Sequence, residues 1–247
     1  MTGSTSGLGK VIARRFAAEG AAVVVSGRNE ERGVLVVDDL TARGGTATFV
    51  PADLGNEEAC SRLVEEAVEK LGSLTILVNN AVATVSGRAT VTEQDTPSWE
   101  EAFRVNVTAP MWLCRAAIPH MVETGHGSIV NVSSRAAERA SPALAAYVAS
   151  KGALNALTRS IATDYATQGV RANTLSPGYV LHEQRDADLT PERQERLEAM
   201  HLTRLPIADD VAAGAVYLAG RESETVTGML LPVDGGSSTA ARATSFG

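Results

Sequence analysis

Short apolar runs alternate with longer helical patterns along nearly the whole chain of 247 residues. Such runs are typical of strands buried on both faces of a parallel sheet. Between them, apolar side chains recur every three or four residues, as on one face of a helix. This alternation predicts parallel βαβ units in an open, doubly wound sheet, with three α/β/α layers and one domain over residues 1–247. We expect strands at 22–25, 46–50, 74–78, 128–132, 170–175 and 228–233, and helices at 10–19, 30–43, 57–71, 97–121, 142–166 and 208–219.

The composition excludes several classes of protein. A formal net charge of −7 argues against nonspecific binding of nucleic acid or of a membrane surface. No apolar run reaches the roughly 18 residues of a membrane span. Cys60 and Cys114 form no disulfide or metal pattern and fit a cytoplasmic protein. Three of the histidines, His120, His126 and His201, have no ligand spacing, and we expect no metal.

A glycine-rich turn opens the first expected helix. Gly3, Gly7 and Gly9 have a spacing that lets a backbone approach a pyrophosphate at a helix N-terminus, where free N–H groups favour negative charge. The hydroxyls of Ser4 and Ser6 can add hydrogen bonds to such a ligand. An ordinary turn explains the glycines about equally well when they are considered alone.

Arg28 follows the strand expected at 22–25, and no acidic residue accompanies it. In dinucleotide-binding folds, an acid at this place binds the ribose 2′-hydroxyl, whereas an arginine accommodates a 2′-phosphate. Its guanidinium offers a bidentate fork for phosphate. The alternative is an ordinary solvated loop arginine. We therefore predict NADP (NADPH) as the preferred cofactor, with NAD as the alternative.

Tyr147 and Lys151 are four residues apart in an expected helix, so their side chains project from the same face. A phenol has a pKa near ~10, and a neighbouring ammonium favours the phenolate and lowers that pKa. The pair therefore reads as a general acid/base suited to neutral pH. An amphipathic helix with an unrelated Tyr and Lys is the alternative reading of this pair alone.

Taken together, the motifs make the chain resemble the short-chain dehydrogenase/reductase family over nearly its whole length. The family has a Rossmann-type fold and binds a nicotinamide dinucleotide. The matching residues, in family order, are Thr2-Gly3, Gly7-Leu8-Gly9, Asp53-Leu54, Asn79-Asn80-Ala81, Asn106, Ser134, Tyr147, Lys151, Pro177-Gly178, Thr227-Gly228 and Val233-Asp234-Gly235-Gly236.

The resemblance implies four catalytic residues. Tyr147 would exchange a proton with the substrate oxygen. Lys151 would lower the pKa of the tyrosine and bind the nicotinamide ribose. Ser134, rather than Ser133, would hydrogen-bond the substrate oxygen, and Asn106 would hold a water of a proton relay.

The resemblance also implies cofactor contacts. Asp53, followed by Leu54, would lie beside the adenine, Asn80 near the adenosine ribose, and Val180 beside the nicotinamide carboxamide. The glycine turn, Gly3 to Gly9 with Leu8, would carry the pyrophosphate. The segment 179–204 would be an insertion that lines the substrate site. The expected partner is a small carbonyl or alcohol substrate, and the expected assembly is a homotetramer or homodimer through helices 97–121 and 142–166.

Three departures from the family pattern stand out. Val82 replaces a glycine where the backbone packs close to the cofactor, and His182 replaces a threonine that often binds the nicotinamide amide. The sequence also begins at the glycine turn, whereas the family has a strand directly before it, in the middle of the sheet. Its loss would leave buried backbone groups unpaired, at ~1–3 kcal/mol each. We expect that Met1 is not the natural start; the alternative is a compromised fold.

The expected activity is that of an NADP-dependent oxidoreductase that transfers a hydride between the cofactor and a carbonyl or secondary alcohol. Within the family, the sequence resembles 3-oxoacyl-carrier-protein reductases and sugar or polyol dehydrogenases. The alternative is a subunit that binds the cofactor or serves as a scaffold without turnover.

Overall fold

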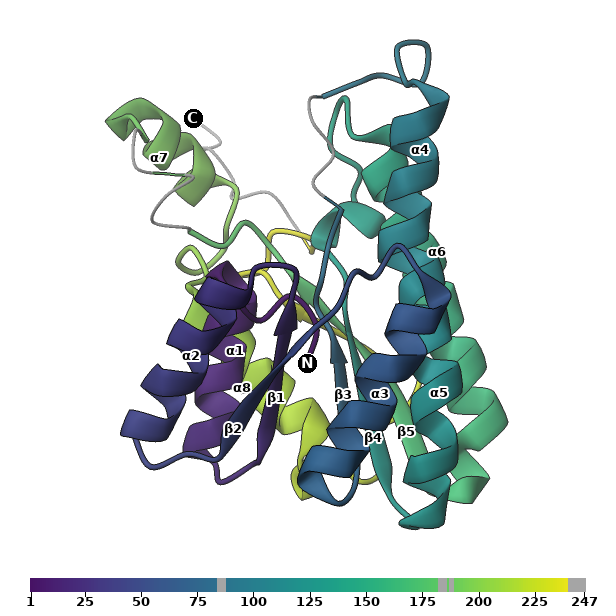
Figure 1. Cartoon of the computed structure of the whole chain (residues 1–247). Helices are drawn as coiled ribbons and strands as arrows, with labels where there is room; N and C mark the ends of the chain where they lie inside the picture. Colours follow the sequence, from purple (N-terminus) through teal and green to yellow (C-terminus); the bar gives the residue numbers. More distant parts are fainter. Residues whose placement is uncertain (84–87, 182–185, 187–188, 240–247) are drawn as a thin grey trace.

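The structure is a computed structural model that describes residues 1–83, 88–181, 186 and 189–239. Strands and helices alternate as expected (Figure 1). The strands are β1 (Val23–Gly27), β2 (Ala47–Pro51), β3 (Ile76–Asn79), β4 (Gly127–Val132), β5 (Val170–Pro177) and β6 (Leu230–Val233). The α-helices are α1 (Gly7–Ala18), α2 (Glu30–Ala42), α3 (Glu57–Leu71), α4 (Thr96–Phe103), α5 (Ala109–Glu123), α6 (Ala145–Tyr165), α7 (Pro191–Ala199) and α8 (Ala208–Ala219). A π-helical turn, η1 (Arg104–Thr108), joins α4 to α5, and a 3-10 turn, η2 (Arg135–Ala137), follows β4.

Helices cover both faces of the parallel strands (Figure 1). One core cluster joins α1, α2 and α8 to the sheet through Ile12, Val36 and Leu218. A second cluster joins α3, α5 and α6 to the other face through residues such as Leu113 and Ile161. The predicted three-layer α/β/α architecture is therefore confirmed.

The strands are all parallel, but the sheet is interrupted in the middle. Over the described residues, β1 pairs with β2, and a second sheet has the order β3-β4-β5-β6. The first residues of the chain lie between β1 and β3 (Figure 1). The Met1 amine donates to the Val24 oxygen, the Thr2 amide to Val78 and the Ser4 amide to Ser26. The sheet is therefore interrupted between β1 and β3, where the family has its first strand. Residues 1–4 supply hydrogen bonds that connect the two sheets there.

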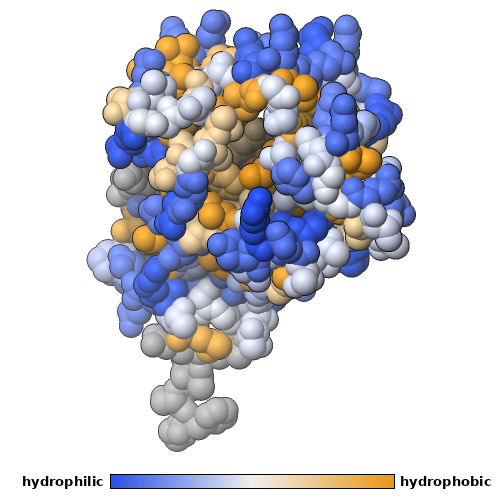
Figure 2. All heavy atoms as spheres, turned by 90° about the horizontal axis from the view of Figure 1, so that it is seen from below, coloured by the Kyte–Doolittle hydropathy of each residue, from blue (hydrophilic) through white to orange (hydrophobic). Residues whose placement is uncertain are grey.

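Figure 2 shows the end of the molecule opposite the carboxyl ends of the strands. Hydrophilic side chains predominate around its margin, and apolar side chains reach the surface near its centre. None of the described helices is long and apolar enough to cross a membrane.

Helix boundaries follow from local sequence. Asn56 caps α3 by accepting a hydrogen bond from the amide of Ala59, and Gly72 ends the helix in a left-handed conformation. Thr190 caps α7 in the same manner, which confirms the helix start expected at Thr190-Pro191. The expectation of a helix from residue 142 was wrong by three residues, since α6 begins at Ala145. Ala143 has a φ of 56°, which no residue of a right-handed helix can adopt.

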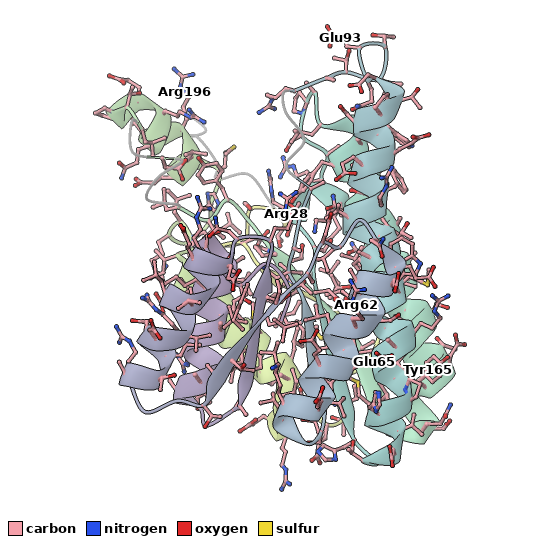
Figure 3. All side chains as sticks on the ribbon, in the orientation of Figure 1. Arg28, Arg62, Glu65, Glu93, Tyr165 and Arg196 are labelled. Atoms are coloured by element: carbon pink, nitrogen blue, oxygen red, sulfur yellow. The ribbon has the colours of Figure 1, made fainter. Side chains whose placement is uncertain are left out.

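The segment between β5 and α8 holds α7, which projects above the carboxyl ends of the strands (Figure 1). On the opposite side, α4 rises to a comparable height. In Figure 3, Arg196 of α7 and Glu93 of the loop before α4 mark the tips of these two projections. The carboxyl edge of the sheet lies between them, so any ligand held there is flanked on both sides.

Candidate active site

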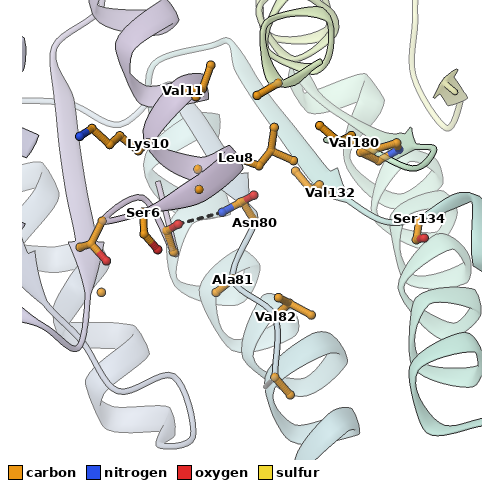
Figure 4. A pocket seen from close by; sticks show the side chains of 18 of the residues that line it. Ser6, Leu8, Lys10, Val11, Asn80, Ala81, Val82, Val132, Ser134 and Val180 are labelled. Carbon is orange, nitrogen blue, oxygen red and sulfur yellow. Dashed lines mark hydrogen bonds between the residues drawn. The ribbon is translucent and has the colours of Figure 1, made fainter. Parts of the chain in front are cut away.

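A cavity of about 1790 Å³ opens at the carboxyl ends of the strands. An ordinary ligand pocket measures ~300–1,000 Å³, so this one has room for a large cofactor together with a substrate. In Figure 4, Ser6 and Leu8 of the glycine turn lie on one side, Ser134 on the other, and Asn80 and Val180 between them. The lining brings together nearly every residue that the sequence assigned to the site, from segments far apart in the chain: Gly3, Ser6, Gly7, Leu8, Gly9, Arg28, Asp53, Leu54, Asn80, Ser134, Tyr147, Lys151 and Val180.

The glycine turn is shaped to present its backbone. Gly3 and Gly7 have φ angles of 60° and 52°, which only glycine adopts without strain. A Cβ on Gly9 would lie 2.1 Å from the Gly3 carbonyl oxygen, so this position admits no side chain. Ser6, the N-cap of α1, makes no side-chain cap, and the first turn carries no acid. The helix N-terminus is therefore open to an anion, which fits a dinucleotide pyrophosphate.

Ser4 and Ser6 lie in different surroundings. The Ser4 side chain is fully buried, and its hydroxyl donates to the Met1 oxygen and accepts from the amide of Ser26. Ser4 does not line the cavity, because these bonds turn it into the protein, where it joins the glycine turn to β1. Ser6 and the adjacent Thr5 do line the cavity. Thr5 was missed because its spacing carries no signal.

Asn80 lines the cavity and also supports the glycine turn. Its side-chain nitrogen donates to the carbonyl oxygens of Thr2 and Gly3, at 3.1 and 3.0 Å (Figure 4). The Thr2 hydroxyl in turn accepts from the amides of Asn80 and Ala81. The loop after β3 and the glycine turn therefore form one bonded unit.

Basic side chains gather at the end of the cavity formed by α1, α2 and β1. Arg28 lies there, at the carboxyl edge of the sheet (Figure 3). Lys10 and Arg32 line the same end, and Arg14 does so while paired with Asp39 at 2.6 Å. Over the described residues, no acid lies in ion-pair distance of the first three cations. Lys10 and Arg32 belong to no motif, and the signal for them in the sequence is their place in the first turns of two helices beside the glycine turn and Arg28.

Asp53 and Leu54 line the cavity beyond the end of β2. Asp53 is exposed, and one carboxylate oxygen accepts from the amide of Gly55 at 3.1 Å. This bond fixes the turn that leads into α3. Val82, which replaces the family glycine, lies in the lining with 49% of its surface exposed. His182 lies outside the described residues.

Tyr147 and Lys151 both face the cavity from the first turns of α6. The Lys151 ammonium lies 5.9 Å from the centre of the Tyr147 ring. Only 3% of Lys151 is exposed, and its Nζ donates to the Val132 carbonyl oxygen at 2.8 Å. Burial disfavours the charged form and lowers the pKa of Lys151 from its ordinary value of 10.5 to about 8. The amine is thus a cation that titrates close to neutral pH.

Ser134 and Ser133 both line the cavity, but their hydroxyls have different hydrogen-bond partners. The Ser134 hydroxyl accepts from the amide of Ala136 at 3.1 Å and caps η2, so its proton remains available to a ligand in the cavity. Ser133 is buried, and its hydroxyl donates to the Lys151 carbonyl oxygen at 3.4 Å. This difference agrees with the choice of Ser134 over Ser133.

Asn106 lies behind the cavity rather than in its lining. It is fully buried in the π-helical turn between α4 and α5. Its side-chain oxygen accepts from the amide of Ala83 at 2.9 Å, and its nitrogen donates to the Ser150 hydroxyl at 3.0 Å. Ser150 donates in turn to the Tyr147 carbonyl oxygen at 2.9 Å. Sequence reasoning had assigned no role to Ser150.

A glycine turn at an open helix N-terminus, next to a Tyr–Lys pair and a free serine hydroxyl, defines a dinucleotide-dependent oxidoreductase of the Rossmann type. Comparison with known families agrees: the family model described as enoyl-(acyl carrier protein) reductase matches residues 3–238. The chain belongs to the short-chain dehydrogenase/reductase family, as its motifs predicted.

Individual relatives cover almost the entire chain. A 3beta-hydroxysteroid dehydrogenase of Mediterraneibacter gnavus is 36% identical over 97% of this chain and 94% of its own length. A 3-oxoacyl-[acyl-carrier-protein] reductase of Chlamydia pneumoniae is 33% identical over 96% of this chain and 94% of its own. The crystal structure of a gluconate 5-dehydrogenase of Burkholderia cenocepacia, in complex with NADP and tartrate, has a TM-score of 0.90 and 33% identity over 97% of this chain and 94% of that one.

These relatives establish the chain as an NAD(P)-dependent dehydrogenase/reductase that acts on CH–OH groups. All three relatives are named as enzymes. They therefore do not support the alternative of a scaffold without turnover.

Proposed function

We propose that this protein reduces a carbonyl or oxidises a secondary alcohol with a preference for NADP, and that Tyr147 is its acid/base. The observation that carries the proposal is the placement of Tyr147 and Lys151 on one face of α6, in the wall of a cavity whose far end is basic. Ser134 lies in the same wall.

The glycine turn and the cations support a cofactor orientation in which the adenine end lies at the basic end of the cavity and the nicotinamide lies near Tyr147. The open N-terminus of α1 would hold the pyrophosphate through backbone N–H groups. Arg28 would bind the 2′-phosphate that distinguishes NADP from NAD, and Asp53 and Leu54 would lie beside the adenine. Asn80 would contact the adenosine ribose. Val180 would lie beside the nicotinamide, which leaves that ring next to Tyr147.

The hydrogen-bond donors in the cavity wall define what the protein contributes to the reaction. A bound nicotinamide would supply or accept the hydride. In the direction of reduction, the hydroxyls of Ser134 and Tyr147 donate to the substrate oxygen and polarise the carbonyl. Tyr147 then gives its proton to that oxygen. Lys151 would favour the resulting phenolate through its charge and would bind the nicotinamide ribose.

The substrate end combines apolar and polar groups. Leu144, Leu181 and Ile207 line it together with Tyr179, whose hydroxyl donates to Asp186 at 2.5 Å. The relatives include hydroxysteroid, sugar-acid and acyl-carrier-protein enzymes, so a panel must cover all three chemistries. We propose the segment 179–204 as the main source of selectivity among them.

The assembly is proposed to be a homotetramer or homodimer through the faces of α4, α5 and α6. Trp99 of α4 supports this proposal, because it is an aromatic residue with 38% of its surface exposed that packs at a tilt against Phe103, with 4.9 Å between ring centres. A monomeric mass by light scattering would contradict it. The buried free thiols of Cys60 and Cys114 support a cytoplasmic location.

The proposal is tested by following NADPH and NADH oxidation at 340 nm with a panel of a steroid ketone, a keto sugar acid and an acetoacetyl thioester. Turnover of at least one carbonyl with a higher kcat/KM for NADPH is the expected result. NADPH binding without oxidation across the panel would contradict the enzymatic function, and tighter binding of NADH would contradict the role of Arg28.

A further inference from the structure

The proposed acid/base Tyr147 lies in a first helix turn that has no side-chain cap. It is the third residue of α6, and Leu144 at the N-cap supplies no side-chain hydrogen bond. Ala143, directly before it, has a positive φ of 56°. First turns without a cap fray easily, since their N–H groups have no partner in the helix. The position of Tyr147 matters for proton transfer, so the bonds made by its backbone in this turn bear on the reaction.

The hydroxyl of Ser150 makes one of these bonds from inside the protein. Ser150 is fully buried, accepts from the Asn106 side chain at 3.0 Å and donates to the Tyr147 carbonyl oxygen at 2.9 Å. Asn106 is itself fixed by the amide of Ala83 at 2.9 Å. Ala83 follows Asn80 and Val82 in the loop that lines the cavity.

The bonds therefore form a continuous path from the cavity floor to the catalytic helix. The path passes through η1, a π-helical turn, and such turns are frequent at functional sites. Both hydrogen-bonding directions of the Ser150 hydroxyl are used, so it has no freedom to reorient. We propose that Ser150 is a positioning residue that fixes Tyr147 relative to the cofactor loop through Asn106. This inference rests on the proposed role of Tyr147.

A serine in a helix commonly bonds a carbonyl one turn back merely to satisfy its hydroxyl. The same helix provides a control for that simpler explanation. Thr158 donates to the Leu154 carbonyl oxygen at 2.8 Å and accepts from the Asn131 side chain at 2.9 Å. It repeats the arrangement of Ser150 about two turns further along α6, away from Tyr147.

The first experiment compares Ser150→Ala with Thr158→Ala. Ser150→Ala is expected to lower kcat by roughly 10- to 100-fold, as small displacements of reacting groups do, to shift the pH profile of kcat, and to leave the Kd of NADPH nearly unchanged. Thr158→Ala is expected to lower Tm while its kcat and pH profile remain those of the wild type. Equal effects of the two variants on kcat, or a wild-type pH profile for Ser150→Ala, would overturn the proposal.

A second pair separates the hydroxyl from packing. Ser150→Thr and Ser150→Val both add a methyl-sized group in the buried site, but only threonine keeps the hydroxyl. Ser150→Thr should retain a kcat well above that of Ser150→Val. Equal kcat values for the two variants would show that the hydroxyl does not position Tyr147.

Hydrogen–deuterium exchange tests the same point without turnover. Ser150→Ala should speed the exchange of peptides covering 145–151 and not of those covering 155–165, with the wild type as reference. If the wild type oxidises no NADPH, the proposed function fails while this measurement still decides whether Ser150 holds the turn. Unchanged exchange at 145–151 would overturn the inference even in an active enzyme.

Discussion

The Lys151 ammonium donates a 2.8 Å hydrogen bond to the carbonyl oxygen of Val132, the last residue of β4. The bond joins α6 to β4, the strand that Ser133 and Ser134 follow. This bond gives the buried ammonium a polar partner 5.9 Å from the Tyr147 ring, where no described acidic residue pairs with it. The charge is held by a backbone carbonyl on one side and remains directed at the cavity on the other.

Tyr147→Phe is expected to remove nearly all turnover. The variant keeps the ring and loses the only group proposed to exchange a proton with substrate, a contribution of about 10²–10⁴-fold in rate. NADPH binding, followed by its fluorescence, should stay close to that of the wild type. Tyr217→Phe on α8, 40% exposed and outside the cavity lining, is the matched control and should keep full activity. Substantial turnover in Tyr147→Phe would remove the tyrosine from the mechanism.

Lys151 should make stability depend on alkaline pH. Its pKa is about 8 in the folded chain and 10.5 ordinarily. Below pH 8 both states carry the proton, and burial of the charge costs stability. Between about 8 and 10.5 the folded chain releases its proton before the unfolded chain does, so the free energy of unfolding rises with pH. The rise is on the order of 3 kcal/mol over the full window.

Urea unfolding of the wild type and of Lys151→Met at several pH values from 7.5 to about 9.5 measures this dependence. The difference in unfolding free energy, wild type minus variant, should increase with pH, because the variant lacks the amine and all other groups cancel. A difference that stays constant would mean that the amine keeps its ordinary pKa.

Arg28→Ser is expected to weaken NADPH binding by about tenfold or more, since a hydrogen bond to a charged group contributes ~1.5–3 kcal/mol. NADH, which lacks the 2′-phosphate, should bind with little change. Arg62→Ser is the control, because Arg62 lies on α3 outside the cavity and pairs with Glu58. Titration of both cofactors against the variants gives the comparison. Equal losses for NADPH and NADH would assign Arg28 a general electrostatic role instead.

Gly9→Ala is expected to disrupt both the glycine turn and cofactor binding. The new Cβ would lie 2.1 Å from the Gly3 oxygen and 2.5 Å from the Asn80 side-chain nitrogen, so the turn must shift. Gly152→Ala is the control: it is also helical, and its Cβ would meet nothing within 4 Å. Replacement of a helical glycine by alanine alone should stabilise by up to ~1 kcal/mol. Thermal unfolding should therefore show a lower Tm for Gly9→Ala and an equal or higher one for Gly152→Ala.

Much of the fold could be predicted because local signals agree with it. The helices expected at 57–71 and 208–219 match α3 and α8 at both ends. For α3, Asn56 and Gly72 mark the two ends in the sequence itself. The start of α6 could not be predicted, because an alanine at φ 56° is imposed by its surroundings and not by its own preference. The π-helical turn at 104–108 is equally invisible, since its residues suit an ordinary helix.

The residues of the site also divide into those that the sequence predicts and those that it does not. Residues whose type limits their chemistry, such as Tyr147, Lys151 and Arg28, were predicted from sequence and do line the cavity. Small hydroxyl side chains carry no such signal. Ser4 and Ser6 look equivalent in the sequence, yet the Ser4 hydroxyl bonds within the protein while Ser6 faces the cavity. Ser150 was missed for the same reason, because only its two partners give its hydroxyl a direction.

The interruption between β1 and β3 separates the residues proposed to bind the cofactor from those proposed to react with the substrate. Arg28 and Asp53 follow strands of the two-stranded sheet, whereas Ser134, Tyr147 and Lys151 surround the four-stranded sheet. A dinucleotide held as proposed spans both sheets, so its binding energy also opposes their separation. A ligand at 100 times its Kd stabilises the folded state by ~2.7 kcal/mol. Binding of the proposed cofactor would therefore oppose separation of the two sheets, and the folded fraction of the protein would rise with the cofactor concentration.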